Sequence, residues 1–203
     1  MTKIAVTMRY DFFDSVGEFR ECLDVEWPLI LESAGFFPVL ISSGVDDVRD
    51  FIEAMGVDGI VLTGGGQPDS GDPRETLEKK ILTLAQKNGI PVFGVCRGFQ
   101  QMNLFLGGRV GRSSSHVGTN HPVSGVLFDE SPVFVNSFHH NVISEQDLAS
   151  GFQTVAQSKD SFVEAALHRV LPWLGIMWHP ERPGNDVSAG PAMVSDFFSR
   201  RLR

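Results

Sequence analysis

The chain has 203 residues, of which 42% are hydrophobic and 21% are charged, and its formal net charge is −8. This length predicts one domain over residues 1–203, because single cores stop growing beyond about 250 residues, and no stretch approaches the ~18 apolar residues that cross a bilayer. The negative charge argues against a nucleic-acid surface, since clustered Lys and Arg bind phosphate backbones.

The first half of the chain alternates between predicted strands and helices. Short apolar segments predict buried parallel strands at Ile4–Met8, Phe37–Ile41, Ile60–Thr63 and Pro91–Val95. Helical spacing predicts helices over Glu18–Ser33, Val45–Met55 and Arg74–Asn88, the last starting near Asp72 and Pro73 and ending at Gly89. This alternation is typical of a doubly wound α/β fold with a parallel core.

A glycine run, Thr63-Gly64-Gly65-Gly66-Gln67, follows the third predicted strand. Sites in open α/β sheets form beyond the carboxyl ends of the strands, so we expect this run to face Cys96. An anionic tetrahedral intermediate needs two N–H donors, each contributing roughly 3 kcal/mol, and we select those of Gly65 and Arg97. A simple tight turn is one alternative, and a phosphate loop is disfavoured because no Gly-Lys-Ser/Thr follows.

Cys96 lies in Gly94-Val95-Cys96-Arg97-Gly98, between an apolar strand and a helix predicted over Arg97–Leu106. Two glycines at this spacing permit the tight turn that exposes a nucleophile in α/β hydrolases. A helix N-terminus and the adjacent Arg97 favour the thiolate. The alternative is an ordinary buried thiol.

The second half of the chain predicts a largely antiparallel extension and a closing helix over Pro191–Leu202. Its short predicted strands lie near Val123–Leu127, Val133–Asn136, Thr154–Ser158, Val163–Leu167 and Leu174–Trp178. The last strand runs into His179-Pro180-Glu181, where the proline favours extended backbone and allows both flanking side chains to project to one side. This arrangement suits a base and its orienting carboxylate, although an incidental surface loop is the alternative.

The two cysteines, Cys22 and Cys96, are too few for a disulfide framework or a thiolate metal site, which favours a reducing compartment. No export signal is visible at the N-terminus, so we expect a cytoplasmic protein without a membrane partner. We interpret Cys22 as a core residue on a helical face with Leu23 and Trp27. We interpret His140 as structural, with a place in the site as the alternative if the register is shifted by one residue.

Taken together, GVCRGFQ, WHPE and LTGGG resemble the class I glutamine amidotransferase-like superfamily over most of the chain. VFGVCRGFQQMNLFLGG, VNSFHHN and GIMWHPER are most similar to its γ-glutamyl hydrolases, which include γ-glutamyl-γ-aminobutyrate hydrolase. The resemblance implies a flavodoxin-like fold, a Cys96–His179–Glu181 triad and an oxyanion hole at Gly65 and Arg97. We expect neither a metal nor an organic cofactor, because the thiol and the oxyanion donors supply the covalent and electrostatic terms.

The resemblance also implies substrate contacts. Gln100 and the stretch Ser137, Phe138 and His139 would hold the glutamyl group. The segment Glu18–Trp27 and the compact length are similar to the branch that hydrolyses γ-glutamyl-CDP-amidate in capsule phosphoramidate synthesis. A diphosphate needs cations, and the candidates are Arg9, Arg109, Arg112, His116 and His121.

The expected activity is therefore hydrolysis of a small γ-glutamyl conjugate through a cysteinyl thioester. One rival is a glutaminase subunit that delivers ammonia to a synthetase partner and has a hydrophobic docking face around the site. A second rival is a non-catalytic binding or regulatory relative of the fold. The sequence leaves the leaving group and the oligomeric state open, with a homodimer as one candidate.

Overall fold

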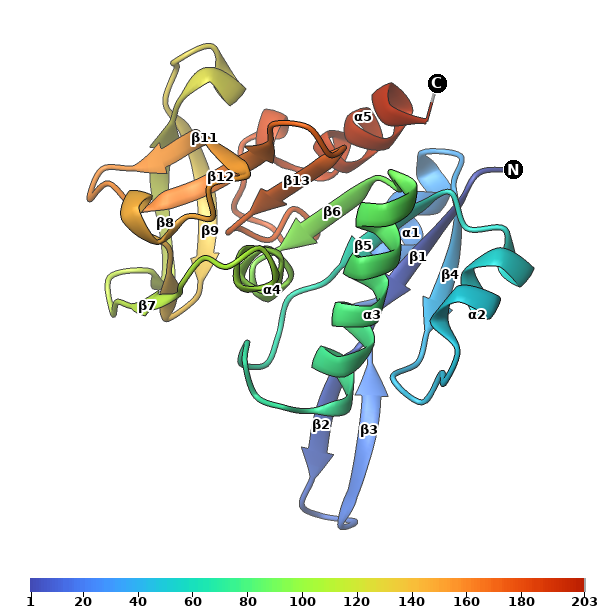
Figure 1. The fold of residues 1–203 in the computed structure, drawn as a ribbon. Coiled ribbons are helices and arrows are strands. Elements are labelled where there is room, and N and C mark those ends of the chain that lie inside the picture. The colour runs from blue at the N-terminus through green and yellow to red at the C-terminus, as the bar shows by residue number, and fades with distance from the viewer. Residues whose placement is uncertain (203) are drawn as a thin grey trace.

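A nine-stranded sheet runs through the computed structural model, which describes residues 1–202 (Figure 1). Its order is β4-β1-β5-β6-β13-β12-β11-β8-β9. The parallel part contains β1 (Lys3–Thr7), β4 (Phe37–Ile41), β5 (Gly59–Leu62), β6 (Val92–Val95) and β13 (Trp173–Ile176). The antiparallel part contains β8 (Val117–Ser124), β9 (Val133–Phe138), β11 (Phe152–Ser158) and β12 (Val163–His168).

This topology confirms the predicted parallel core with an antiparallel extension. The strand β13 joins the two parts, because it pairs in parallel with β6 and antiparallel with β12. The last strand of the second half therefore completes the parallel core, which the sequence pattern alone did not indicate.

Helices cover both faces of the parallel strands. The helices α1 (Glu26–Ser33) and α5 (Pro191–Arg201) pack on one face, and α2 (Val48–Met55), α3 (Pro73–Asn88) and α4 (Arg97–Phe105) pack on the other (Figure 1). Alternate strand residues enter the two cores, since Ile4 and Val6 contact the first and Ala5 the second. Burial on both faces explains the continuous apolar runs of these strands.

The helix α3 begins and ends at the residues that its sequence predicts. The Asp72 side chain accepts a hydrogen bond from Glu75 N at 2.7 Å, and Pro73 occupies the first turn. Gly89 ends the helix in the left-handed region at φ 68°. These local devices fix where the helix begins and ends.

The predicted helix over Glu18–Ser33 is wrong in its first part. Arg9–Phe13 (β2) and Glu18–Cys22 (β3) form an antiparallel hairpin that projects from the sheet (Figure 1). Cross-strand aromatic pairs stabilise it, with the ring centroids of Tyr10 and Phe19 4.8 Å apart. The pairing partner of Glu18–Cys22 therefore decided its conformation.

Cys22 accordingly does not lie on a helix. It ends β3, is half-buried, and its Sγ lies 3.1 Å from Asp11 Oδ2. Burial, followed by the contact with Asp11, raises the pKa of the Cys22 thiol. The interpretation as a core residue is wrong, although Trp27, five residues later, is fully buried as expected.

The predicted strand Val123–Leu127 is displaced. The strand β8 ends at Ser124, because Gly125 adopts φ 149° and a side chain there would lie 2.4 Å from Val155 O. A short 3₁₀ helix, η1 (Val126–Phe128), follows. The other short elements are η2 (Glu145–Asp147), η3 (Val187–Ala189) and the two-stranded β7 (Gly111–Arg112) with β10 (Asn141–Val142).

Within residues 1–202, no helix has the length and apolar character that a membrane span requires.

Candidate functional site

Cys96 occupies a tight connection between β6 and α4. Its backbone has φ 51° and ψ −106°, a conformation that costs a non-glycine residue about 1–3 kcal/mol. Two hydrogen bonds hold it, one from Cys96 N to Ile176 O at 2.7 Å and one from Gln100 N to Cys96 O at 3.0 Å. The thiol is therefore fixed at the N-terminus of α4, as its sequence predicts.

The flanking glycines allow the connection to pack closely. A side chain at Gly98 would lie 2.1 Å from Leu62 O, and one at Gly94 would lie 2.3 Å from Met102 Sδ. Neither distance is tolerable for a Cβ atom. Gly98 thus allows α4 to pack closely on β5, and Gly94 allows the end of β6 to pack closely on α4.

The second functional segment follows β13 and brings His179 to Cys96. His179 Nδ1 lies 2.7 Å from Glu181 Oε1, and both side chains are buried. Burial lowers the pKa of His179, but hydrogen bonds and charge interactions with Cys96 and Glu181 outweigh it and raise the pKa to about 9. Cys96 and His179 line one cavity, with Glu181 next to His179, and the roles of nucleophile, base and orienting carboxylate stay a prediction.

Asn136 holds the His179 backbone and was missed in the sequence. Its Oδ1 accepts from His179 N at 2.9 Å, and its Nδ2 donates to His179 O at 2.8 Å. Asn185 Nδ2 also donates to His179 O, at 2.8 Å. Because Asn136 acts on the main chain of a distant segment, no local pattern could have identified it.

Arg74 orients the glycine run. The buried guanidinium donates to the carbonyl oxygens of Thr63, Gly64 and Gly65 at 2.6, 3.1 and 2.9 Å. In a trans peptide the C=O and N–H point in opposite directions, so the N–H of Gly65 points away from Arg74. Gly65 itself has φ 86°, and a side chain there would meet Arg9 Cδ at 2.4 Å.

A buried charge cluster links this run to the nucleophile segment. Glu78 accepts from Arg74 Nε at 2.8 Å and also pairs with Arg97 Nη1. Arg97 Nε donates to Gln67 O at 3.2 Å. The Arg97 side chain therefore packs against α3 and the end of the glycine run, while its backbone opens α4.

These segments enclose a cavity of about 200 Å³ beyond the carboxyl ends of the strands. Of the predicted site residues it collects Arg9, Gly65, Cys96, Gln100, Phe138, His139 and His179. Glu181 lies behind His179, and the His179 ring meets the Phe138 ring edge to face at 5.9 Å. The predicted residues thus converge from five segments of the chain.

Ser137 and four of the predicted cations lie elsewhere. Ser137 is fully buried and donates to His116 O at 2.6 Å, so it supports the wall rather than lining it. Arg109 is exposed and pairs with Asp147, and Arg112 is exposed on β7. His116 and His121 belong to a buried cluster behind the wall. The structure keeps only Arg9 of those cations at the cavity.

Five residues beyond the predicted site residues also line the cavity, namely Gly66, Gln67, His140, Asn141 and Arg182. Asn141 Nδ2 donates to Gln100 Oε1 at 3.1 Å and to Gln67 Oε1 at 3.2 Å, which fixes both amides. Arg182 lies over the Phe138 ring at 5.1 Å, and His140, expected to be structural, is exposed at the rim. Arg182 directly follows the WHPE stretch, which could have identified it.

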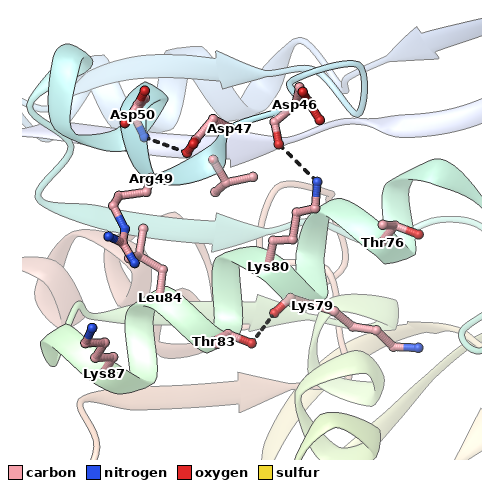
Figure 2. A pocket seen from close by; sticks show the side chains of 11 residues that line it. Asp46, Asp47, Arg49, Asp50, Thr76, Lys79, Lys80, Thr83, Leu84 and Lys87 are labelled. Carbon is pink, nitrogen blue, oxygen red and sulfur yellow. Dashed lines mark hydrogen bonds between the residues drawn. The ribbon is translucent and has the colours of Figure 1, made fainter.

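A larger hollow of about 650 Å³ lies between α2 and α3, away from Cys96 (Figure 2). Two of its polar side chains make local contacts, since Lys80 Nζ donates to Asp46 O at 3.0 Å and Asp47 caps α2. Its lining contains no cysteine and no histidine, in contrast to the cavity at Cys96. The smaller cavity at Cys96 is therefore the candidate active site.

Comparisons with known proteins agree with this fold and geometry. Residues 38–200 match the family model described as glutamine amidotransferase class-I. The γ-glutamyl-CDP-amidate hydrolase of Campylobacter jejuni is 28% identical over 190 residues, covering 88% of this chain and 90% of that protein. The carbamoyl phosphate synthase small chain of Desulfovibrio desulfuricans is 27% identical over 87% of this chain and 44% of its own length.

A solved structure supports the fold. The glutamine amidotransferase of Thermotoga maritima superposes with a TM-score of 0.69 at 18% identity, covering 89% of this chain and 76% of that chain. At this identity the likeness concerns the arrangement of helices and strands. The flavodoxin-like architecture is therefore shared.

Proposed function

This chain belongs to the class I glutamine amidotransferase family, and we propose that it hydrolyses the γ-glutamyl amide bond of a small conjugate through a Cys96 thioester. The observation that carries the proposal is the cavity in which Cys96 and the His179–Glu181 pair meet the glycine run. The similarity to a γ-glutamyl-CDP-amidate hydrolase over most of both chains supports the substrate class.

In the proposed first step, the Cys96 thiolate attacks the γ-carbonyl carbon. The N–H groups of Gly65 and Arg97 stabilise the negative oxygen, and the His179 imidazolium donates its proton to the departing nitrogen. The C–N bond breaks, and the glutamyl group remains as a thioester on Sγ. Neutral His179 then takes a proton from water, which attacks the thioester and releases glutamate.

The remaining cavity residues fit a glutamyl group. Gln100, held by Asn141, presents its amide to the α-amino or α-carboxylate end, and Phe138 and His139 line the opposite wall. Arg9 and Arg182 supply cations for an anionic leaving group, in place of the four that lie elsewhere. A nucleotide diphosphate amidate is therefore our preferred conjugate.

Glutamate release from γ-glutamyl-CDP-amidate, γ-glutamyl-γ-aminobutyrate and free glutamine tests the proposal. We expect the nucleotide conjugate to give the highest kcat/KM. Cys96→Ala should lower kcat by about 10⁴-fold or more, whereas Cys22→Ser, at the other cysteine, should retain it. Full turnover by Cys96→Ala would refute the mechanism, and no glutamate release by the wild type from any of the three substrates would support a non-catalytic relative.

The glutaminase-subunit alternative has one specific observation in its favour. The β2–β3 hairpin begins at Arg9, which lines the cavity, and exposes Phe12, Phe13 and Phe19 at its sides. Exposed aromatic residues next to a site suit a protein partner. A strong preference for free glutamine in the same assay, with activity rising only on addition of a synthetase, would favour this function.

A further inference from the structure

Three histidines and a glutamate converge behind the cavity wall. His116 precedes β8, His121 lies on β8, His139 follows β9, and Glu164 lies on β12. One potential ligand atom from each lies within 4.8 Å of all the others. We call these four residues the His₃Glu cluster.

The atoms that face the centre of the cluster lack hydrogen bonds within residues 1–202. They are His116 Nδ1, His121 Nε2, His139 Nε2 and both Glu164 oxygens. His116, His139 and Glu164 are only 3%, 4% and 0% exposed. An unpaired buried polar group costs about 1–3 kcal/mol, so a convergence of five such atoms indicates that a further group is bound between them.

The outward-facing nitrogens of the histidines are, by contrast, engaged. His116 Nε2 lies 3.0 Å from Asp160 Oδ2, and His139 Nδ1 lies 2.8 Å from Asn141 O. His121 Nδ1 lies 3.4 Å from Pro122 O. A carboxylate or carbonyl on the outer nitrogen is the arrangement that orients metal-binding histidines and directs the free nitrogen to the ion.

We propose that the His₃Glu cluster binds one divalent first-row transition ion, with Zn²⁺ as the preferred occupant. In a tetrahedral zinc site with bonds of about 2.0–2.1 Å, neighbouring ligand atoms lie about 3.3 Å apart. Glu164 Oε1 lies 3.1 Å from His116 Nδ1 and 3.7 Å from His121 Nε2, and Glu164 Oε2 lies 3.9 Å from His139 Nε2. Imidazole with one carboxylate suits zinc and its neighbours better than Ca²⁺ or Mg²⁺.

An ion pair between His116 and Glu164 is the competing explanation. His116 Nδ1 and Glu164 Oε1 lie 3.1 Å apart, but their orientation does not meet the geometry of a hydrogen bond. Both atoms therefore remain without a hydrogen-bond partner. Such a pair would also leave His121 Nε2 and His139 Nε2 buried without a partner. A bound cation satisfies all four residues at once.

The proposed ion would have a structural role beside the candidate active site. It would join β8, β9 and β12 and fix His139, which lines the cavity, next to Asn141, which holds Gln100. No sequence motif indicated this site, because its ligands come from separated segments without a ligand spacing. The sequence alone predicts no metal, and it offers His116 and His121 only as candidate cations for the substrate.

The test measures zinc in tag-free protein by elemental analysis and then Zn²⁺ and Co²⁺ binding to chelator-treated protein. We expect one ion per chain, a tetrahedral Co²⁺ absorption spectrum and a higher melting temperature with Zn²⁺. His121→Ala and Glu164→Gln should bind at least about tenfold more weakly, and Asp160→Asn about ten- to a hundredfold more weakly. His140→Ala, at the histidine next to the cluster, should bind as the wild type does.

Wild-type protein that binds neither ion and shows no shift in melting temperature would overturn the proposal, even if a variant fails to fold. Unchanged binding by folded His121→Ala and Glu164→Gln would likewise refute it, since the ion would then lie elsewhere. These readouts do not depend on the γ-glutamyl hydrolase activity, so either proposal can fail alone.

Discussion

At the scale of single residues, His179 depends on two unrelated kinds of contact. Its ring is paired with Cys96 and Glu181, which sets its charge, and its backbone is held by Asn136, which sets its position. A side chain at Gly64 would lie 2.5 Å from His179 Cε1, so the glycine run packs against the ring. Charge and position can therefore be tested separately.

The charge of His179 predicts a pH dependence. With a pKa of about 9, raised above the ordinary 6.5, the protonated ring stabilises the fold fully below about pH 6.5, and this contribution is lost as pH rises through 9. We expect kcat/KM to fall above pH 9 for the same reason. In Glu181→Gln the fall should begin at lower pH, because a neutral amide stabilises the imidazolium less. Profiles of kcat/KM against pH for the wild type and Glu181→Gln check this expectation. Glu53→Gln, at an exposed position of α2, is the control and should keep the wild-type profile.

The position of His179 predicts the effect of Asn136→Ala. Removing the amide leaves His179 N unpaired in a buried site, which should lower the free energy of unfolding by about 1–3 kcal/mol. The value of kcat should fall as the ring loses its alignment. Asn120→Ala is a matched control, since Asn120 is opposite Asn136 in the β8–β9 register but exposed. Equal losses in the two variants would contradict this role.

At the scale of elements, α3 supports both segments that we propose to supply the oxyanion donors. Arg74 and Glu78 lie one turn apart on its buried face, and the first binds the glycine run while the second pairs with Arg97 of α4. Buried charges are tolerated here because each has hydrogen-bonded partners. Arg74 and Glu78 thus position the proposed oxyanion donors without lining the cavity themselves.

Arg74→Met tests this support. Three carbonyl oxygens lose their donor, so the glycine run can rotate and the Gly65 N–H leaves its place. We expect kcat to fall about 10²-fold, near the loss of one oxyanion donor, with KM nearly unchanged. Steady-state kinetics measure kcat and KM separately. Lys79→Met, on the exposed side of α3, should leave both kcat and KM unchanged. A loss confined to KM would argue against a positioning role.

At the scale of the whole molecule, β6 and β13 join the two halves of the chain. Four register pairs connect them, from Val92 with Trp173 to Val95 with Ile176. Cys96 and His179 follow the ends of these two adjacent strands. The pairing that joins the halves therefore also brings the thiol to the imidazole.

This continuity predicts that residues 1–203 unfold as one cooperative unit. Denaturant midpoints from tryptophan fluorescence and far-ultraviolet circular dichroism should coincide, because Trp27 reports on the first half and Trp173 and Trp178 on the second. Separate transitions would show two folding units and contradict the single-domain prediction. Addition of Zn²⁺ should move both midpoints together.

Local sequence patterns determined much of this protein. The apolar runs identified four of the five parallel strands, Asp72, Pro73 and Gly89 marked α3, and Gly94, Cys96 and Gly98 marked the tight turn between β6 and α4. His179 and Glu181, two residues apart, met as expected. In each case the residues that act together are close in the chain, so backbone geometry alone relates them.

Tertiary structure decided what depends on partners distant in sequence. The strand conformation of Glu18–Cys22 required β2, the place of β13 required β6, and the role of Asn136 required a segment 43 residues away. The four ligands of the His₃Glu cluster come together only when β8, β9 and β12 pair. Hydrogen bonds and metal ligation act over a few ångströms in space, and only the folded chain determines which distant residues lie within that range.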